Sequence, residues 1–175
     1  MPIDDDIAYV ALGSNLGDRA GHLRAALDAI DATPGAAVLK CSPLLETEPV
    51  GPSGQGRYLN AVACVRAAMS PEQLMRRLLE IEAMRGRDRS AGLRWGARTL
   101  DLDLLVFGER VMDQPGLTLP HPRLGERLFV LQPWRMIAPA LVVPGLGQSV
   151  ESLARALEAG GIWAPGAAAQ GGGAA

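Results

Sequence analysis

The 175-residue sequence is poor in cysteine, lysine, histidine and aromatic residues. Its two cysteines, Cys41 and Cys64, form neither a disulfide framework nor a metal-knuckle spacing, and we expect buried, reduced thiols. Phe, Trp and Tyr make up 4% of the chain, which argues against an RNA-binding sheet that stacks bases on aromatic strand residues. No apolar run approaches the ~18 residues of a membrane span, and the first residues are acidic, so we expect a cytoplasmic protein that does not bind membranes.

The charged residues are nearly balanced, with 17 Lys plus Arg against 19 Asp plus Glu and a formal net charge of −2. This balance gives the whole chain no attraction to nucleic acid, so any basic site must be local. Lys40 is the only lysine, and the rest of the Lys plus Arg total is arginine. A compositional bias accounts for that preference, but it does not decide where the arginines gather.

Strand and helix signals alternate along the chain. Short apolar runs, partly β-branched, predict strands at 7–12, 37–46, 58–66 and 100–107. Helical spacing predicts one helix capped by Asp18 that ends before Pro34, and a second capped by Ser70 with Pro71 at its first position. The second helix should turn four residues inward: Leu74, Leu78, Ile81 and Met84. The order βαββαβ predicts a ferredoxin-like α+β sandwich, an antiparallel sheet with helices on one face.

The remaining residues should be C-terminal additions to this sandwich. We expect an irregular segment at 117–122 and a helix within 125–137, where Pro133 interrupts the periodicity. A short strand at 141–143 and a last helix at 150–157 complete the regular structure.

The segments rich in glycine, proline or arginine predict loops and ends. A long loop should span 47–57, and a second, mobile loop should span 85–97. We expect a single domain over 7–159, with flexible segments at 1–6 and 160–175, because the Ala- and Gly-rich end lacks apolar side chains that offset ordering.

The sharpest chemical signal is Asp101-Leu102-Asp103, which lies in a run of leucines. Side chains two apart on a strand leave from the same face, so both carboxylates point one way while the leucines point into the core. Two like charges this close are costly without a cation, and no sequence-adjacent cation neutralises both. Mg²⁺ is the natural candidate, because it accepts one or two carboxylates and completes its shell with water and phosphate oxygens.

An isolated D-x-D is more often an ordinary solvated strand face, and the neighbouring arginines decide against that alternative here. Five arginines gather before it: Arg85, Arg87, Arg89, Arg94 and Arg98. Two carboxylates beside an arginine-rich loop suit phosphoryl transfer, in which metal ions and guanidinium groups balance the charge of the transferring group. No G-x-x-x-x-G-K-[ST] motif occurs, which excludes a P-loop enzyme.

Three further features have a structural and a functional interpretation. The turn at 13–17, G-S-N-L-G, predicts a tight strand-to-helix connection rather than a phosphate cradle. His121 lies between two prolines, where it is either a packing residue or a rigidly held hydrogen-bond donor. Trp95 lies in the basic loop, and a tryptophan in such a polar segment is unusual for a core residue. We expect it to belong to a lid that closes over a planar ligand.

Together these motifs resemble the 6-hydroxymethyl-7,8-dihydropterin pyrophosphokinase family. The longest match is R-W-G-A-R-T-L-D-L-D-L-L at 94–105, and the strand and turn A-Y-V-A-L-G-S-N-L at 8–16 also fits. Further matches are E-T-E-P-V-G-P at 46–52, Y-L-N at 58–60, P-H-P-R at 120–123 and I-A-P at 137–139. The resemblance implies transfer of pyrophosphate from ATP to the hydroxymethyl group of the pterin, giving AMP and the pterin diphosphate in tetrahydrofolate biosynthesis.

The resemblance also implies roles for individual residues. Asp101 and Asp103 would hold two Mg²⁺ ions with ATP, and Arg87 and Arg98 would stabilise the transferring group. The implied ATP contacts, some through backbone atoms, are Glu82, Arg89, Arg94, Leu104, Thr118, His121, Pro122 and Arg127. The implied pterin contacts are Thr47, Glu48, Val50, Tyr58, Asn60, Trp95 and Phe129. ATP and hydroxymethyl dihydropterin are the expected partners of a monomer.

The pterin pocket also has an interpretation from chemistry alone. A flat heterocycle suits aromatic faces such as Tyr58 and Phe129, and an amide such as Asn60 can read its donor and acceptor edge. Both aromatic residues could equally be core residues. Two other functions remain open: a non-catalytic sensor on the same scaffold, and another ATP-dependent kinase that transfers one phosphoryl group instead of two.

Overall fold

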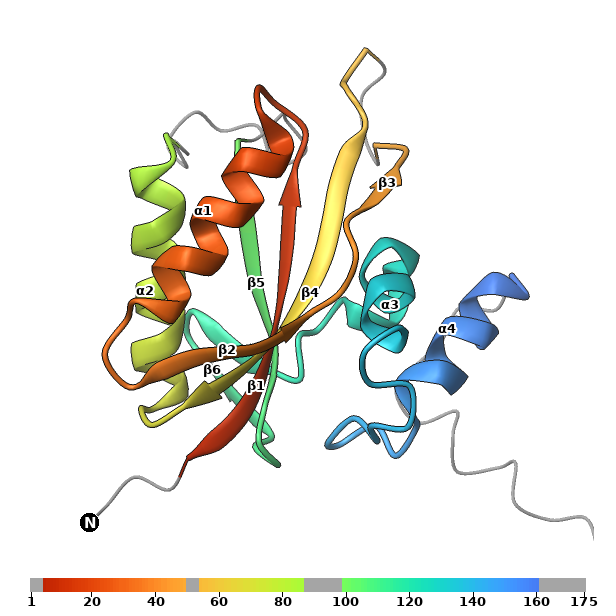
Figure 1. Ribbon diagram of the computed structural model, residues 1–175. Coiled ribbons are helices and arrows are strands. Elements are labelled where there is room, and N and C mark those ends of the chain that lie inside the picture. The colour runs from red at the N-terminus through yellow and green to blue at the C-terminus, as the bar shows by residue number, and fades with distance from the viewer. Residues whose placement is uncertain (1–4, 50–53, 87–98, 161–175) are drawn as a thin grey trace, which may run out of the picture.

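The computed structural model of the chain describes residues 5–49, 54–86 and 99–160 (Figure 1). Its elements follow in the order β1 (Asp6–Ser14), α1 (Arg19–Asp31), β2 (Ala36–Cys41), β3 (Leu45–Thr47), β4 (Tyr58–Ala67), α2 (Pro71–Met84), β5 (Asp101–Phe107), β6 (Met112–Gln114), β7 (Leu117–Leu119), a 3-10 helix (Leu124–Glu126), α3 (Leu128–Arg135) and α4 (Val150–Glu158). The predicted flexible ends lie almost wholly outside the described residues, although Asp6 already belongs to β1.

The main sheet is antiparallel, with the strand order β2-β4-β1-β5 and with β3 also paired to β4. Helix α1 connects β1 to β2, and α2 connects β4 to β5. This arrangement confirms the predicted ferredoxin-like α+β sandwich. Because neighbouring strands run in opposite directions, the end of β1 lies beside the starts of β4 and β5, which is where the candidate site forms.

The predicted strand 37–46 is divided in two in the structure. Ser42 still bonds to β4, donating its N–H to the Val62 carbonyl at 2.9 Å and accepting the Val62 N–H on its Oγ at 3.0 Å. Pro43 follows and has no N–H to donate, so the pairing resumes only at Leu45. Thr47 therefore lies in β3 rather than in the predicted loop.

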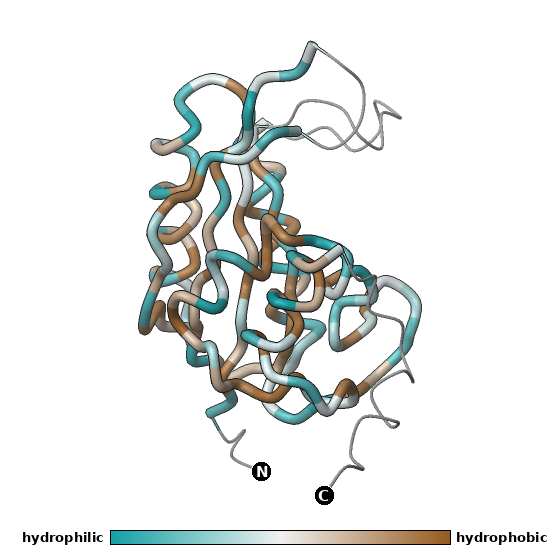
Figure 2. The backbone as a smooth tube through the Cα atoms, turned by 90° about the vertical axis from the view of Figure 1, so that its right-hand side faces the viewer, coloured by the Kyte–Doolittle hydropathy of each residue, from teal (hydrophilic) through white to brown (hydrophobic). Residues whose placement is uncertain are grey.

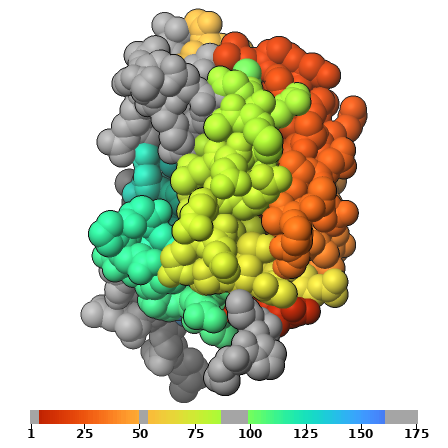
Figure 3. All heavy atoms as spheres, turned by 90° about the vertical axis from the view of Figure 1, so that its left-hand side faces the viewer, coloured from red at the N-terminus to blue at the C-terminus, as the bar shows by residue number. Residues whose placement is uncertain are grey.

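Both predicted helix caps are confirmed. The Asp18 side chain accepts the N–H of Gly21 at 3.0 Å, and Ser70 forms a reciprocal capping box with Gln73 next to Pro71. Helices α1 and α2 lie side by side on one face of the sheet (Figures 1 and 3). Their apolar stripes pack on strand residues of that face, with Leu23, Leu78 and Leu102 among the fully buried members. Leu74, Leu78 and Ile81 are buried as predicted, whereas Met84, the last residue of α2, is 61% exposed.

The C-terminal additions cover part of the other face of the sheet. Helices α3 and α4 pack there on residues such as Val62 and Val106 and form a second apolar core. Trp134 is fully buried in it, with its ring 5.5 Å from that of Tyr9. Figure 2 views the molecule from this side and shows hydrophobic segments concentrated in its middle. Within the described residues, the sheet therefore has helices on both faces, not on one alone.

Of the local predictions for the second half of the chain, two are wrong and two are confirmed. The segment 117–122, predicted to be irregular, contributes β7, which forms a hairpin with β6. The helix predicted within 125–137 is confirmed as α3, which follows a 3-10 turn and contains Pro133. The strand predicted at 141–143 is an isolated bridge between Val142 and Ser149, whereas the predicted last helix is confirmed as α4.

The two cysteines are free, as predicted, but both are only partly buried. Burial still raises the pKa of the Cys41 thiol. None of the helices in the described part of the chain combines the length and apolarity that crossing a bilayer requires.

Candidate active site

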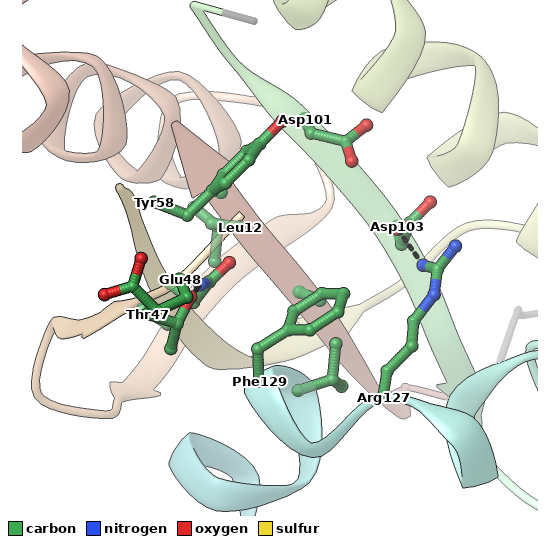
Figure 4. Close-up of a pocket in the computed structure, with 13 residues that line it drawn as sticks. Leu12, Thr47, Glu48, Tyr58, Asp101, Asp103, Arg127 and Phe129 are labelled. Carbon is green, nitrogen blue, oxygen red and sulfur yellow. Dashed lines mark hydrogen bonds and ion pairs between the residues drawn. The ribbon is translucent and has the colours of Figure 1, made fainter. Parts of the chain in front are cut away.

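An open cavity of about 680 Å³ empty volume lies where the end of β1 meets the starts of β4, β5 and α3 (Figure 4). It is lined by Ala11, Leu12, Gly13, Thr47, Glu48, Tyr58, Asn60, Ala61, Asp101, Asp103, Arg127, Phe129 and Val130. The lining combines apolar, aromatic, amide and carboxylate side chains from segments that are far apart in sequence. A lining of this mixed character suits a small organic ligand with a polar edge.

Gly13 forms the floor of the cavity. It pairs with Asn60 of β4 on one side and with Asp101 of β5 on the other, so the three residues form a row across the sheet. A Cβ at this position would lie 3.0 Å from Asn60 Oδ1 and 3.6 Å from the Tyr58 ring. The prediction that Gly13 belongs to a turn missed this role, because β1 runs on to Ser14.

The two aspartates of β5 face the same cavity, as the strand period predicts. Leu100, Leu102 and Leu104 point into the opposite core, and each is at most 3% exposed. The structure therefore confirms the geometric prediction of two carboxylates on one side of the strand.

Asp103 has counter-charges that are distant in sequence. Arg127 donates from Nη1 to Asp103 Oδ2 at 2.9 Å, and His121 Nε2 lies 3.6 Å from Asp103 Oδ1. Burial raises the pKa of Asp103, but the hydrogen bond and charge of His121 and those of Arg127 outweigh it and lower the pKa to about 2. Asp103 is therefore ionised at neutral pH.

His121 is held in one orientation by the backbone. The backbone N–H of His121 donates to the Leu105 carbonyl of β5 at 2.8 Å. Its ring Nδ1 accepts the backbone N–H of Arg123 at 3.2 Å. Because Nδ1 accepts, the proton of the neutral ring lies on Nε2, which faces Asp103. The structure thus favours the positioned donor over the packing residue.

On the β3 and β4 side, Asn60 is 6% exposed and donates from Nδ2 to Thr47 Oγ1 at 2.6 Å. This bond fixes the amide, so that Oδ1 lies above Gly13. Tyr58 and Phe129 present their rings in the cavity wall, and the Arg127 guanidinium lies 5.8 Å from the Phe129 ring centroid. An amide edge and two aromatic rings thus adjoin the carboxylate pair.

The structure brings eight predicted site residues together as cavity lining: Thr47, Glu48, Tyr58, Asn60, Asp101, Asp103, Arg127 and Phe129. His121 joins them through Asp103, and Pro122 follows it in the chain. Six predicted site residues lie outside the described residues: Val50, Arg87, Arg89, Arg94, Trp95 and Arg98.

Three predicted ATP contacts do not line the cavity. Leu104 is 3% exposed with its side chain in the core, so a contact there would use backbone atoms. Thr118 donates to Asp113 across the β6–β7 hairpin at 2.9 Å. Glu82 is 1% exposed and accepts the N–H of Leu102.

The donor set fits magnesium carried by a phosphate ligand better than a resident metal. Among residues 5–49, 54–86 and 99–160, no group of three or more His, Cys, Asp and Glu side chains could hold a metal ion. Two carboxylates suffice for Mg²⁺ when water and phosphate oxygens fill the other positions. Zn²⁺ sites usually contain several His or Cys ligands, and the residues that line this cavity include neither type.

Comparisons with known proteins agree with this geometry. The solved structure of wild-type Plasmodium falciparum HPPK-DHPS with STZ-DHP matches the fold with a TM-score of 0.69. The match covers 88% of this chain and 43% of that chain, at 13% sequence identity. The "2-amino-4-hydroxy-6-hydroxymethyldihydropteridine pyrophosphokinase" of Pseudomonas aeruginosa is 45% identical over 136 residues, 78% of this chain and 83% of the relative. The Bacillus subtilis protein of the same name is 42% identical over 129 residues, 74% of this chain and 76% of the relative. The model of the family 7,8-dihydro-6-hydroxymethylpterin-pyrophosphokinase matches residues 9–139, and the chain therefore belongs to this family.

Proposed function

We propose that this chain transfers pyrophosphate from Mg-ATP to the hydroxymethyl group of 6-hydroxymethyl-7,8-dihydropterin in folate biosynthesis. The hydroxymethyl oxygen bonds to the β-phosphorus, the bond from that phosphorus to the α,β-bridging oxygen breaks, and AMP leaves as the hydroxyl proton is lost. Family membership supports the reaction. The observation that carries it in the structure is the carboxylate pair of β5 facing the same cavity as the Asn60 amide.

In this proposal the carboxylate side of the cavity binds the triphosphate. Asp101 and Asp103 would hold two Mg²⁺ ions, which supply positive charge to the phosphate oxygens. Arg127 and His121, which contact Asp103, are close enough to contact phosphate oxygens bound beside it. Arg87 and Arg98 would stabilise the transferring group, while the other predicted ATP contacts are Glu82, Arg89, Arg94, Leu104, Thr118 and Pro122.

The amide side of the cavity would bind the pterin. Because Thr47 holds the Asn60 amide, Oδ1 is left to accept an N–H from the edge of a flat heterocycle. Tyr58 and Phe129 would contact its faces. The remaining predicted pterin contacts are Glu48, Val50 and Trp95.

We assign no general base. A loose transition state for phosphoryl transfer requires little proton removal before attack, so alignment and charge would account for most of the rate. Losing either β5 carboxylate would then lower turnover by about a hundredfold or more, as for removal of one preorganised electrostatic group.

The test is the identity of the nucleotide product. We expect AMP and the pterin diphosphate when the protein is incubated with Mg-ATP and the hydroxymethyl dihydropterin, and neither product without Mg²⁺. ADP with a pterin monophosphate would instead indicate transfer of a single phosphoryl group. Pterin binding without any nucleotide product would indicate the non-catalytic sensor.

We also predict that the protein is a cytoplasmic monomer that does not bind nucleic acid or membranes. Sedimentation analysis with and without a mixed-sequence RNA at physiological salt tests the monomeric state and the lack of nucleic-acid binding. A species of twice the mass, or a complex with the RNA, would contradict them.

A further inference from the structure

A fully buried carboxylate lies in the last turn of α2, outside the cavity. Glu82 is 1% exposed, and its Oε1 accepts the backbone N–H of Leu102 at 2.7 Å. Glutamate is rarely this buried, because loss of water disfavours the charge unless hydrogen bonds compensate. The bond is notable for its position, since Leu102 is the residue between Asp101 and Asp103.

The N–H of Leu102 points away from the sheet. Strand β5 is the last strand in the described sheet order, with β1 as its neighbour and Leu12 opposite Leu102. Because the N–H donates to a helix side chain, it lies on the outer edge of β5, where an unpaired donor would otherwise remain. Glu82 thus provides the acceptor for this edge N–H, at the middle of the D-L-D sequence.

The same peptide is held in two further ways. The Leu102 side chain is 1% exposed in the core beneath α1 and α2. Three residues earlier, Thr99 Oγ1 donates to the carbonyl of Arg85 at 2.7 Å, which ties the start of β5 to the end of α2 a second time. Since Asp101 and Asp103 leave the strand on the face opposite Leu102, the placement of this peptide sets the direction of both carboxylates.

We propose that Glu82 is a positioning residue: through the Leu102 peptide it holds Asp101 and Asp103 in the geometry that binds the metal–nucleotide complex. The inference rests on the proposed function, but it gives Glu82 a role other than direct contact with ATP. Partners beyond the ligand shell commonly matter to a metal site in this way, with losses of about 10- to 100-fold in affinity when they are removed.

The experiment compares variants of the whole chain for Mn²⁺ binding in the presence of α,β-methylene-ATP, followed by electron paramagnetic resonance. Glu82→Met keeps the length of the side chain but removes the acceptor, and we expect it to weaken Mn²⁺ binding about 10- to 100-fold. Glu82→Gln keeps an oxygen that can accept the Leu102 N–H, and its loss should be smaller than that of Glu82→Met.

Two controls on the same helix separate positioning from stability. Leu78 is fully buried one turn earlier, so Leu78→Ala should lower the melting temperature without weakening Mn²⁺ binding. Glu80 is exposed and paired with Arg77, so Glu80→Gln should change neither quantity. Equal loss of Mn²⁺ affinity in Glu82→Met and Leu78→Ala would overturn the proposal, as would unchanged affinity in Glu82→Met.

Amide hydrogen exchange of the unmodified protein tests the contact without any variant. We expect the Leu102 amide to exchange slowly, like a paired amide, and rapid exchange would overturn the proposal even if Glu82→Met fails to fold. The outcome is separable from the proposed function. If no AMP forms while Mn²⁺–nucleotide binding still depends on Glu82, the positioning role stands and the proposed reaction fails.

Discussion

Replacing Arg127 with Met removes the cation that is hydrogen-bonded to Asp103, and its effect can be estimated from the structure. The fall in the pKa of Asp103 from 3.8 to about 2 corresponds to about 2 kcal/mol of preference for the ionised form in the folded state. His121 contributes most to this fall and Arg127 the rest, and the Arg127 guanidinium keeps its charge throughout the accessible pH range. We therefore expect a coupling of about 1 kcal/mol between Arg127 and Asp103, a part of that preference.

A double-mutant cycle with Arg127→Met and Asp103→Asn measures this coupling by urea unfolding at pH 7. Because the folded-state pKa of Asp103 is depressed, its stabilising contribution is present above the unfolded-state value near 3.8. It is lost as the pH falls toward about 2. The coupling should therefore be full at pH 7 and shrink between about pH 4 and pH 2.

The matched control is the pair Arg155–Glu151. Its nitrogen–oxygen distance of 2.7 Å is similar to the 2.9 Å between Arg127 and Asp103, but the Arg155 side chain is 75% exposed. A cycle on this exposed pair should give a coupling near zero. Coupling near zero for Arg127 and Asp103 as well would refute the reasoning, because it would mean that the buried contact contributes nothing to the ionised state.

Three further substitutions probe the site and its support. Gly13→Ala places a methyl group 3.0 Å from Asn60 Oδ1. Calorimetry should therefore show pterin affinity reduced about tenfold or more, with little change in the affinity for the ATP analogue. Equal losses for both ligands would contradict the role of Gly13 as the floor of the pterin side of the cavity. Ser70→Ala removes half of a capping box and should cost about 1 kcal/mol of unfolding free energy, with an unchanged value counting against the cap. Trp134→Ala should cost about 3–5 kcal/mol, because a fully buried indole is lost from the second core, and a cost below about 1 kcal/mol would show that this core is not tightly packed.

The sequence patterns that the structure confirms are local ones. The alternation around Asp101 and Asp103 follows from the period of a strand, and the caps at Asp18 and Ser70 require only residues within one turn of each other. The order of strands and helices likewise depends on short windows, and with it the ferredoxin-like topology. Such features are readable before any tertiary contact is known.

What sequence reasoning missed depends on contacts between distant segments. Gly13 forms the cavity floor only because β4 and β5 place Asn60 and Asp101 on either side of it. Arg127 is 24 residues from Asp103, and no spacing rule predicts that pair. Glu82 lies four residues after Leu78, on the buried face of α2, and a charged residue at an inward position was the available signal for its bond to Leu102.

The central claim is that the two carboxylates of β5 bind divalent metal together with the triphosphate. A crystal structure of the protein with Mg²⁺ and α,β-methylene-ATP tests it most directly. We predict metal–oxygen distances of about 2.0–2.1 Å to both Asp101 and Asp103, with the phosphates completing the coordination. Metal and phosphates bound elsewhere, with Arg127 still paired to Asp103, would contradict the account.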